Sequence, residues 1–278
     1  MTDNELYYRS PHGELYCGDS LILMQELPDN SIDLILSDPP FGTTQNSWDT
    51  VRDFNKMWEQ YKRIIKPNGC IAIFAQAPFS HVLACSNMDW YRYEWVIEKT
   101  KATGHLNAKK MPMKAHENVI IFGPPENDVF GLPEESPDTL QIFYKKLPTY
   151  NPQMSEGHPP VHNYTKHTSD GSNYGASKIG ISGGGSTTRY PRDVLRYKWD
   201  TQKSSIHPCQ KPVELLEDII KTYTNAGDTV LDDCMGSCST GVAAVNTERY
   251  FIGYELEKDI YKKAKQRFTD TVGNLEKG

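Results

Sequence analysis

Short apolar runs alternate with amphipathic stretches over most of this chain. In the first third, the runs GELYC, IDLILS and CIAIFA each precede a stretch with helical spacing, such as FNKMWEQYKRIIK. The alternation returns near the C-terminus, in KPVELLEDIIK, TVLDD, VAAVNTE and RYFIGYE. Strands that alternate with helices usually pair in parallel and carry helices on both faces of the sheet. The pattern therefore predicts an α/β fold with a doubly wound, mostly parallel sheet.

Between residues 124 and 203 the alternation disappears. Pro, Gly, Asn, Ser and Tyr dominate there, as in YNPQMSEGHPPVHNYTKHTSDGSNYGASKIGISGGGSTTRY. So long an irregular segment inside a compact domain is usually functional or disordered. Tyrosines interleaved with Lys and Arg are typical of surfaces that stack on bases and pair with phosphates. We therefore expect residues 1–123 and 204–278 to form two halves of one domain, with 124–203 inserted between them.

The charges of the chain are unevenly distributed. The formal net charge of −6 would by itself argue against a nucleic-acid partner. Residues 99–212, however, hold 15 Lys and Arg against 10 Asp and Glu, whereas the remainder holds 15 against 26. A basic segment on an acidic chain is typical of an electrostatic docking surface, and a solvated basic face gives the same pattern.

Composition narrows the class of protein further. With 278 residues, 37% of them hydrophobic, the chain can bury a full core, and no apolar run reaches membrane-spanning length. The N-terminal MTDNELYYRS has neither the basic start nor the apolar core of a signal peptide. Six cysteines show no disulfide framework and no metal-ligand spacing. We expect a cytoplasmic protein of prokaryotic or phage origin, with reduced thiols, no metal and no membrane contact.

Three acids are expected to meet at one edge of the sheet. Asp19, Asp38 and Glu255 each end or follow a predicted strand, and the carboxyl ends of parallel strands are where open α/β sheets bind ligands. Asp38 stands before Pro39 and Pro40, which cannot donate ladder hydrogen bonds and so must end the strand. A strand-ending turn and helix-capping carboxylates are the alternative, purely structural explanation.

A second feature at this edge is the small-residue loop MGSCSTG, which joins the strand TVLDD to a helix. Glu255 ends the following strand, nineteen residues beyond Gly236. A loop that lets the backbone approach a ligand, followed by an acid for ribose hydroxyls, is typical of nucleoside-type sites. The loop lacks the G-x-G-x-x-G spacing and the P-loop lysine, so by itself it leaves ligand and purely structural roles equally open.

Four motifs occur in a fixed order along the chain. They are DPPF at 38–41, HPCQKP at 207–212, LDDCMGSCSTG at 231–241 and FIGYE at 251–255. With these motifs the sequence resembles the β-class amino-methyltransferases of DNA, which transfer a methyl group from S-adenosylmethionine to exocyclic amines, usually N6 of adenine. The resemblance covers residues 13–270 and is weakest across 125–200. It implies a Rossmann-like methyltransferase fold with an inserted, loop-rich target-recognition region.

The resemblance also implies roles for individual residues. Those expected to hold the target base are Asp38, Pro39, Pro40 and Phe41. Those expected to bind S-adenosylmethionine are Asp19, His207, Lys211, Cys234, Gly236, Ser237, Ser239 and Glu255. Those expected to contact double-stranded DNA are Lys109, Lys110, Arg189, Arg192 and Arg196. A homodimer stays open, the sequence does not indicate whether a restriction nuclease partner exists, and TTRYPRDVLRY could instead clasp the chain to its core.

Two positions depart from the family pattern. Cys238 stands where the loop usually carries Gly, and a Cβ there costs about 1 kcal/mol if the position has a positive φ. Asp233 and Cys234 replace the commoner Pro-Phe pair, which removes an aromatic contact to the cofactor. These departures leave open a catalytically silent DNA-binding protein. The family's cytosine-N4 enzymes more often carry Ser before Pro-Pro, so Asp38 favours adenine N6.

Overall fold

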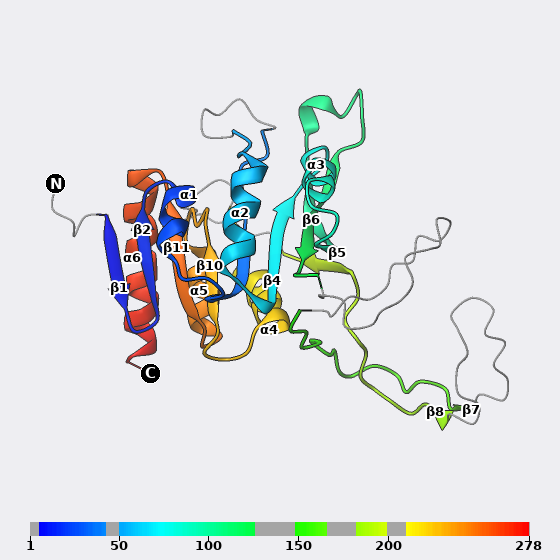
Figure 1. Ribbon diagram of the computed structural model, residues 1–278. Coiled ribbons are helices and arrows are strands. Elements are labelled where there is room, and N and C mark those ends of the chain that lie inside the picture. Colours follow the sequence, from blue (N-terminus) through cyan, green and yellow to red (C-terminus); the bar gives the residue numbers. More distant parts are fainter. Residues whose placement is uncertain (1–5, 43–49, 126–147, 166–181, 199–209, 278) are drawn as a thin grey trace, which may run out of the picture. The chain divides into compact units, whose positions relative to one another are not determined.

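The computed structural model describes residues 6–42, 50–125, 148–165, 182–198 and 210–277. Its centre is a nine-stranded sheet in the order β1-β2-β11-β10-β3-β4-β6-β5-β9 (Figure 1). The strands are β1 (Tyr7–Ser10), β2 (Gly13–Cys17), β3 (Ile32–Ser37), β4 (Ile65–Ala75), β5 (Tyr91–Thr103), β6 (Lys114–Phe122), β9 (Val194–Tyr197), β10 (Thr229–Asp232) and β11 (Tyr250–Glu255).

Most of the sheet is parallel, as the sequence predicts. The adjacent strands β2, β11, β10, β3 and β4 all run in one direction. Strand β6 is antiparallel to β4, and β5 is antiparallel to β6, so β5 runs in the same direction as β4. Strand β9 is parallel to β5. The carboxyl ends of all these strands except β6 therefore lie at one edge of the sheet.

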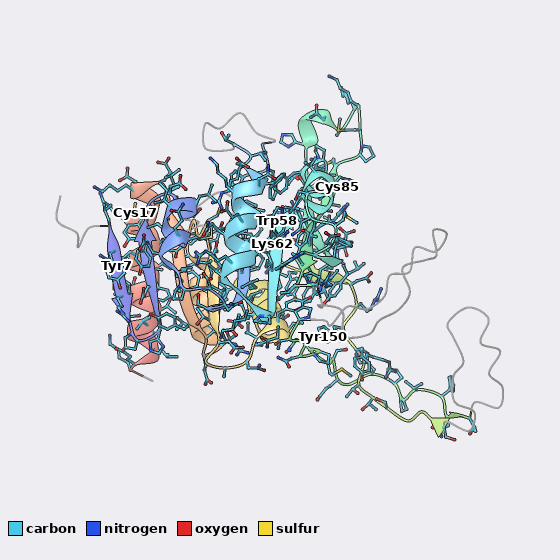
Figure 2. All side chains as sticks on the ribbon, in the orientation of Figure 1. Tyr7, Cys17, Trp58, Lys62, Cys85 and Tyr150 are labelled. Atoms are coloured by element: carbon cyan, nitrogen blue, oxygen red, sulfur yellow. The ribbon has the colours of Figure 1, made fainter. Side chains whose placement is uncertain are left out.

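Helices cover both faces of the sheet and bury two apolar clusters. One face carries α1 (Ser20–Leu23), α2 (Phe54–Ile64) and α3 (Phe79–Cys85), and the other carries α4 (Val213–Tyr223), α5 (Ser239–Asn246) and α6 (Lys258–Leu275). Trp58 lies on α2 (Figure 2). The centre of its ring lies 4.9 Å from that of Phe122, and its indole N–H donates to Ser86 Oγ at 2.8 Å. Because both faces are covered, β3 is buried along its whole length, which explains its continuous apolar run.

The order of the strands reverses between β3 and β10. From β3 the chain passes through α2 to the neighbouring β4, whereas from β10 it passes through α5 to β11 on the opposite side. Strands β3 and β10 are themselves paired in parallel, with Leu34 opposite Val230. The two crossover connections therefore leave a crevice at the carboxyl ends of these strands, where doubly wound sheets hold their ligands.

Residues 152–192 form a compact unit distinct from the rest of the chain. Within this unit, β7 (Tyr164–Thr165) pairs with β8 (Ser182–Gly183), and Ser155 forms a bridge with Arg189. The flanking residues belong to the main unit, because Asn151 bonds to α4 carbonyls and β9 pairs with β5. In the ranges that the structure describes, none of the helices has the length and apolar character needed to span a bilayer.

Candidate active site

A cleft of about 820 Å³ lies at the carboxyl edge of the sheet, around the ends of β2, β3, β10 and β11. Asp19, Asp38 and Glu255 all line it, so the predicted meeting of these acids at one rim is confirmed. The volume lies within the range of pockets that enclose small organic ligands. The predicted base and cofactor residues that line the cleft are Asp19, Asp38, Pro39, Pro40, Phe41, Lys211, Cys234, Gly236, Ser237, Ser239 and Glu255. His207 lies outside the described residues.

Asp38 is partly buried directly after β3 and is bound by a lysine. The Lys211 ammonium donates to Asp38 Oδ2 at 2.6 Å, and only 8% of the Lys211 side chain is exposed. Burial raises the pKa of Asp38 above its ordinary value, the Lys211 ammonium opposes this rise, and the Glu117 carboxylate adds to it. The sequence predicts Lys211 at the cofactor, whereas the structure shows its ammonium on the Asp38 carboxylate.

The pair continues into a row of alternating charges. Lys211 Nζ lies 3.5 Å from Glu117 Oε2, and Glu117 Oε1 pairs with the ammonium of Lys99, whose side chain is 7% exposed. Burial acts to raise the pKa of Glu117, but the Lys211 and Lys99 ammonium groups outweigh it and hold that pKa below its ordinary range. We call Asp38, Lys211, Glu117 and Lys99 the charge row.

Sequence reasoning missed two members of the charge row, Lys99 and Glu117. Both lie in predicted strands, YRYEWVIEKT and HENVIIFG. Glu117 directly precedes the largely apolar run NVIIF, and a charge next to a buried run is expensive to bury without a partner, so this signal could have singled it out. Lys99 has no such signal, because its strand carries several other charged residues. The sequence did not indicate that Glu117 would meet Lys211, because β6 and the residues before α4 are far apart in sequence.

Phe41 lies at the wall of the cleft with one ring face already in contact with protein. Its ring stacks on Phe79, with centroids 5.1 Å apart and ring planes inclined by 26°. Phe54 approaches the same Phe79 ring at 5.9 Å. The Phe41 side chain is partly buried and packs against both apolar clusters. Its position after two prolines and its stacking therefore hold the ring in a defined place beside Asp38.

Carboxylates also fix the loop after β10 and the turn after β2. Glu255 Oε2 accepts the N–H of Gly236 at 3.0 Å, where φ is +49°, and Glu255 Oε1 accepts the N–H of Glu257 at 2.8 Å. Burial raises the pKa of Glu255, and these two backbone N–H groups oppose that rise. Asp19 caps α1 by accepting the N–H of Leu21 at 2.9 Å. Asp19 therefore both caps α1 and lines the cleft.

Arg267 of α6 donates hydrogen bonds to the same loop, and sequence reasoning missed it. Its Nη1 donates to Ser237 O and to Ser239 Oγ, both at 3.0 Å. The two serine hydroxyls lie 3.1 Å apart and share a hydrogen bond. One guanidinium thus fixes the two serines predicted to bind the cofactor, and nothing in the spacing of α6 points to this contact.

Asp233 occupies one of the two unusual positions and is the centre of a buried polar cluster. Its Oδ1 accepts from Ser37 Oγ at 2.6 Å, and its Oδ2 accepts from Tyr61 OH at 2.9 Å and from the Arg52 guanidinium. Arg52 Nη2 also donates to Asp233 O at 3.0 Å and lies 2.6 Å from Cys234 Sγ. An ion pair therefore stands where the family usually has Pro-Phe, and it joins the segment before α2 to the loop after β10.

Replacing Asp233 with Asn should destabilise the fold. The substitution leaves the largely buried Arg52 without its counter-charge, and breaking a buried pair from one side costs about 3 kcal/mol. Urea unfolding at pH 7 measures this loss. Asp29→Asn is the matched control, because Asp29 is 69% exposed while paired with Arg63, and it should cost less than about 1 kcal/mol. Equal losses for the two variants would contradict the assignment.

Cys238 has the left-handed backbone that its position in the loop requires. Its φ is +60° and ψ is +31°, its N–H donates to Met235 O at 2.7 Å, and its side chain is fully buried. A Cβ added to Gly241 would approach Cys238 Sγ to 2.4 Å, so the thiol fills the space that this glycine leaves. The condition under which the thiol strains the loop is therefore met.

Two substitutions at Cys238 separate strain from packing. Cys238→Gly relieves about 1 kcal/mol of backbone strain and loses the buried thiol, so its free energy of unfolding should stay within about 1 kcal/mol of the native value. Cys238→Ala keeps the strain and also loses the sulfur, so it should be less stable than the glycine variant. Urea unfolding of both variants measures the order, and a glycine variant less stable than the alanine variant would contradict the argument.

The basic residues predicted to contact DNA fall into two groups. The connection 104–113 follows β5 at the cleft edge of the sheet (Figure 1). Lys109 and Lys110 are exposed in this connection, and Arg196 is exposed on β9, where its Nη2 lies 3.6 Å from Glu98 Oε1. Arg189 and Arg192 belong to the unit 152–192. There, Arg189 donates to the carbonyls of Ser186, Thr188 and Pro159, so it holds that unit's backbone together.

The sequence of this chain is similar to those of known proteins. Residues 32–266 match the N6/N4 methyltransferase family, described as DNA methylase. Among curated relatives, the type II methyltransferase M.BglII of Bacillus subtilis is 25% identical over 88% of this chain, which spans 66% of that relative's length. The DNA adenine methyltransferase YhdJ of Escherichia coli (strain K12) is 26% identical over 90% of this chain and 80% of its own length.

Solved structures share the fold. The M1.HpyAVI–SAM complex superimposes with a TM-score of 0.57 at 24% identity, covering 91% of this chain and 97% of that one. The PvuII DNA methyltransferase, which is cytosine-N4-specific, superimposes with a TM-score of 0.60 at 16% identity, covering 98% and 95%. At these identities the likeness shows that the α/β fold is shared, and nothing more.

Proposed function

This chain belongs to the N6/N4 family of DNA methylases, and from that membership we propose that it methylates N6 of a flipped adenine in duplex DNA. The methyl donor in this proposal is S-adenosylmethionine. The observation that carries it is the meeting of Asp38 with the loop 233–239 in one cleft, at the point where the strand order reverses. A carboxylate suited to act on an amine and a loop suited to a nucleoside-type ligand thus line the same cleft.

The residues of the cleft fit this cofactor. The cleft has the volume for a nucleoside-sized ligand beside a base, and two carboxylates, Asp19 and Glu255, stand at its rim as acceptors for amino and hydroxyl groups. Gly236 and the serines of the loop allow the backbone to come close to a ligand. When bound, S-adenosylmethionine supplies a methyl group already activated as a sulfonium. The protein therefore has to orient the amine and balance its charge.

Asp38 and Pro39 would orient the amine. The N6 lone pair is delocalised into the adenine ring, which makes the amine a weak nucleophile. The Asp38 carboxylate and the Pro39 carbonyl can each accept one N6–H, and these hydrogen bonds favour a pyramidal nitrogen with an available lone pair. Positive charge develops on nitrogen as it gains the methyl group, and a fixed carboxylate in a partly buried cleft stabilises that charge.

The base must leave the helix to reach Asp38. An exocyclic amine inside a duplex is paired and stacked, so enzymes of this kind of chemistry extrude the nucleotide. Phe41 is held by Phe79 at the cleft wall next to Asp38 and would stack on the extruded base. Lys109 and Lys110 follow β5 at the same edge of the sheet, where they would contact the phosphate backbone.

Two observations favour adenine over cytosine. Asp stands before Pro-Pro, whereas the family's cytosine enzymes more often carry Ser there. A curated relative covering 90% of this chain is also named a DNA adenine methyltransferase. Cytosine N4 is the second candidate, because it is an amine of the same kind and the cytosine-specific PvuII enzyme shares the fold.

Nucleoside analysis of unmethylated DNA after incubation with S-adenosylmethionine tests the proposal. We expect N6-methyladenine from the native protein, and N4-methylcytosine as the only product would overturn the choice of base. Asp38→Asn should lower turnover at least ~100-fold, because it removes the charge opposite the developing cation. Its affinity for S-adenosylmethionine, measured by calorimetry, should stay within about tenfold. Near-native turnover by this variant would contradict the mechanism.

The salt dependence of DNA binding tests the basic residues. Each phosphate contact contributes about 0.9 to the slope of log affinity against log salt, so Arg192→Ala with Arg196→Ala should lower the slope by up to about 1.8. Arg189 is left in place because it bonds backbone carbonyls of its own unit. Arg9→Ala is the control, since Arg9 is 70% exposed on the strand at the opposite end of the sheet order. An unchanged slope in the double variant would remove both arginines from the DNA interface.

A further inference from the structure

Two buried charges beside the cleft have no role in the contacts proposed so far. Lys99 and Glu117 line the cleft together with Asp38 and Lys211, and neither is assigned to the base or to the cofactor. Burying an ion pair costs several kcal/mol of desolvation for each ion and seldom increases stability over an apolar pair. Charges kept in such a place therefore call for an explanation other than stability.

The charge row connects separate elements of the sheet. Glu117 on β6 pairs in register with Ile97 on β5, the strand that also carries Lys99. Lys211 lies just before α4, and Asp38 follows β3. The Lys211 ammonium stands between two carboxylates, at 2.6 Å from Asp38 Oδ2 and 3.5 Å from Glu117 Oε2, and also lies 4.8 Å from the centre of the Phe74 ring. Its position thus depends on the balance between those carboxylates.

We propose that Glu117 and Lys99 are positioning residues for methyl transfer. Glu117 shares the Lys211 ammonium with Asp38, so that Lys211 occupies one oxygen of the Asp38 carboxylate and the other accepts the amine. Lys99 neutralises Glu117 and so limits how strongly it draws Lys211. This inference rests on the proposed function for its consequence in turnover, and on the geometry of the charge row for everything else.

The two residues act on Asp38 in opposite directions. The negative charge of Glu117 raises the pKa of Asp38, and the positive charge of Lys99 lowers it. Removing Glu117 would leave Lys211 to Asp38 alone, which stabilises the carboxylate and makes it a weaker acceptor for the amine. Removing Lys99 would leave Glu117 uncompensated and would draw Lys211 from Asp38, which destabilises the carboxylate.

Among the described residues, Asp232 is a further titrating group that interacts with Asp38. Burial raises the pKa of Asp232, at the end of β10, to about 7, while hydrogen bonds from Thr240 and the Cys234 N–H oppose the rise and the charges of Asp233 and Asp38 add to it. Asp233 is itself paired with Arg52. Asp232 is unchanged in the variants considered below, so differences between their pH profiles report the charge row.

The test compares kcat against pH for the native protein, Glu117→Gln, Lys99→Met and the double variant. The carboxylate form of Asp38 is the active one, so activity is lost as pH falls through its pKa. Glu117→Gln should move this acid limb to lower pH and reduce kcat at least ~tenfold, with the KM for S-adenosylmethionine within about threefold. Lys99→Met should move the limb to higher pH, and the double variant should lie between the two.

The matched control is Glu94→Gln. This variant also replaces a glutamate with a glutamine, but Glu94 is an exposed residue of β5 that accepts from Asn118 Nδ2 at 2.8 Å. The dependence of its kcat on pH should coincide with that of the native protein. Limbs that move in the same direction for both single variants, or that stay in place while melting temperature falls, would assign the charge row to the fold alone and overturn the proposal.

A second measurement separates this inference from the proposed function. The carboxyl carbon of Asp38, followed by 13C NMR titration in the same four proteins, reports its pKa without turnover. Opposite shifts in a protein that methylates no DNA would uphold the charge row and refute the proposed function. Absence of opposite shifts in a protein that does methylate DNA would refute the charge row and leave the proposed function standing.

Discussion

The buried carboxylate of Asp233 joins the loop after β10 to β3, to α2 and to the segment before α2. It follows β10 and binds Ser37 at the end of β3, Tyr61 on α2 and Arg52 before α2. The crevice between two parallel strands is useful only if the strands stay in register and the loops above them stay apart at a set distance. A carboxylate bonded to both sides does this more directionally than apolar packing, because each hydrogen bond restricts angle as well as distance.

The cleft then divides into two sides with different electrostatics. On one side, Asp19 and Glu255 are carboxylates held by backbone N–H groups, without a lysine or arginine pair among the described residues. On the other side, Asp38 is tied to a cation that is itself shared. The first arrangement is suited to neutral polar groups with N–H and O–H donors. The second is suited to a nitrogen that gains positive charge, since the carboxylate is already in place and does not have to rearrange.

Local patterns in the sequence were sufficient for the central strands, the main helices and the residues that stand at strand ends, but the short edge strands β1 and β9 were not predicted. Asp19, Asp38 and Glu255 were predictable because periodicity places strand ends and parallel strands share an edge. Contacts between residues far apart in sequence were not. Arg267 donates to Ser237 and Ser239, and Lys211 donates to Asp38 instead of to a residue near it in sequence. Tertiary packing decides these pairs. The sequence also left open whether Cys238 has a positive φ, because the loop's backbone conformation is not visible in its residues.

The residues that flank the separate unit are each hydrogen-bonded within the main unit. The Asn151 N–H donates to Thr222 O on α4 at 2.7 Å, and the Val96 N–H of β5 donates to Asp193 O, also at 2.7 Å. Both bonds are made by main-chain atoms on either side of residues 152–192, so they do not depend on the side chains of those residues. A longer, shorter or exchanged segment between Asn151 and Asp193 would therefore leave both attachments, and with them the strands that carry the cleft, as they are.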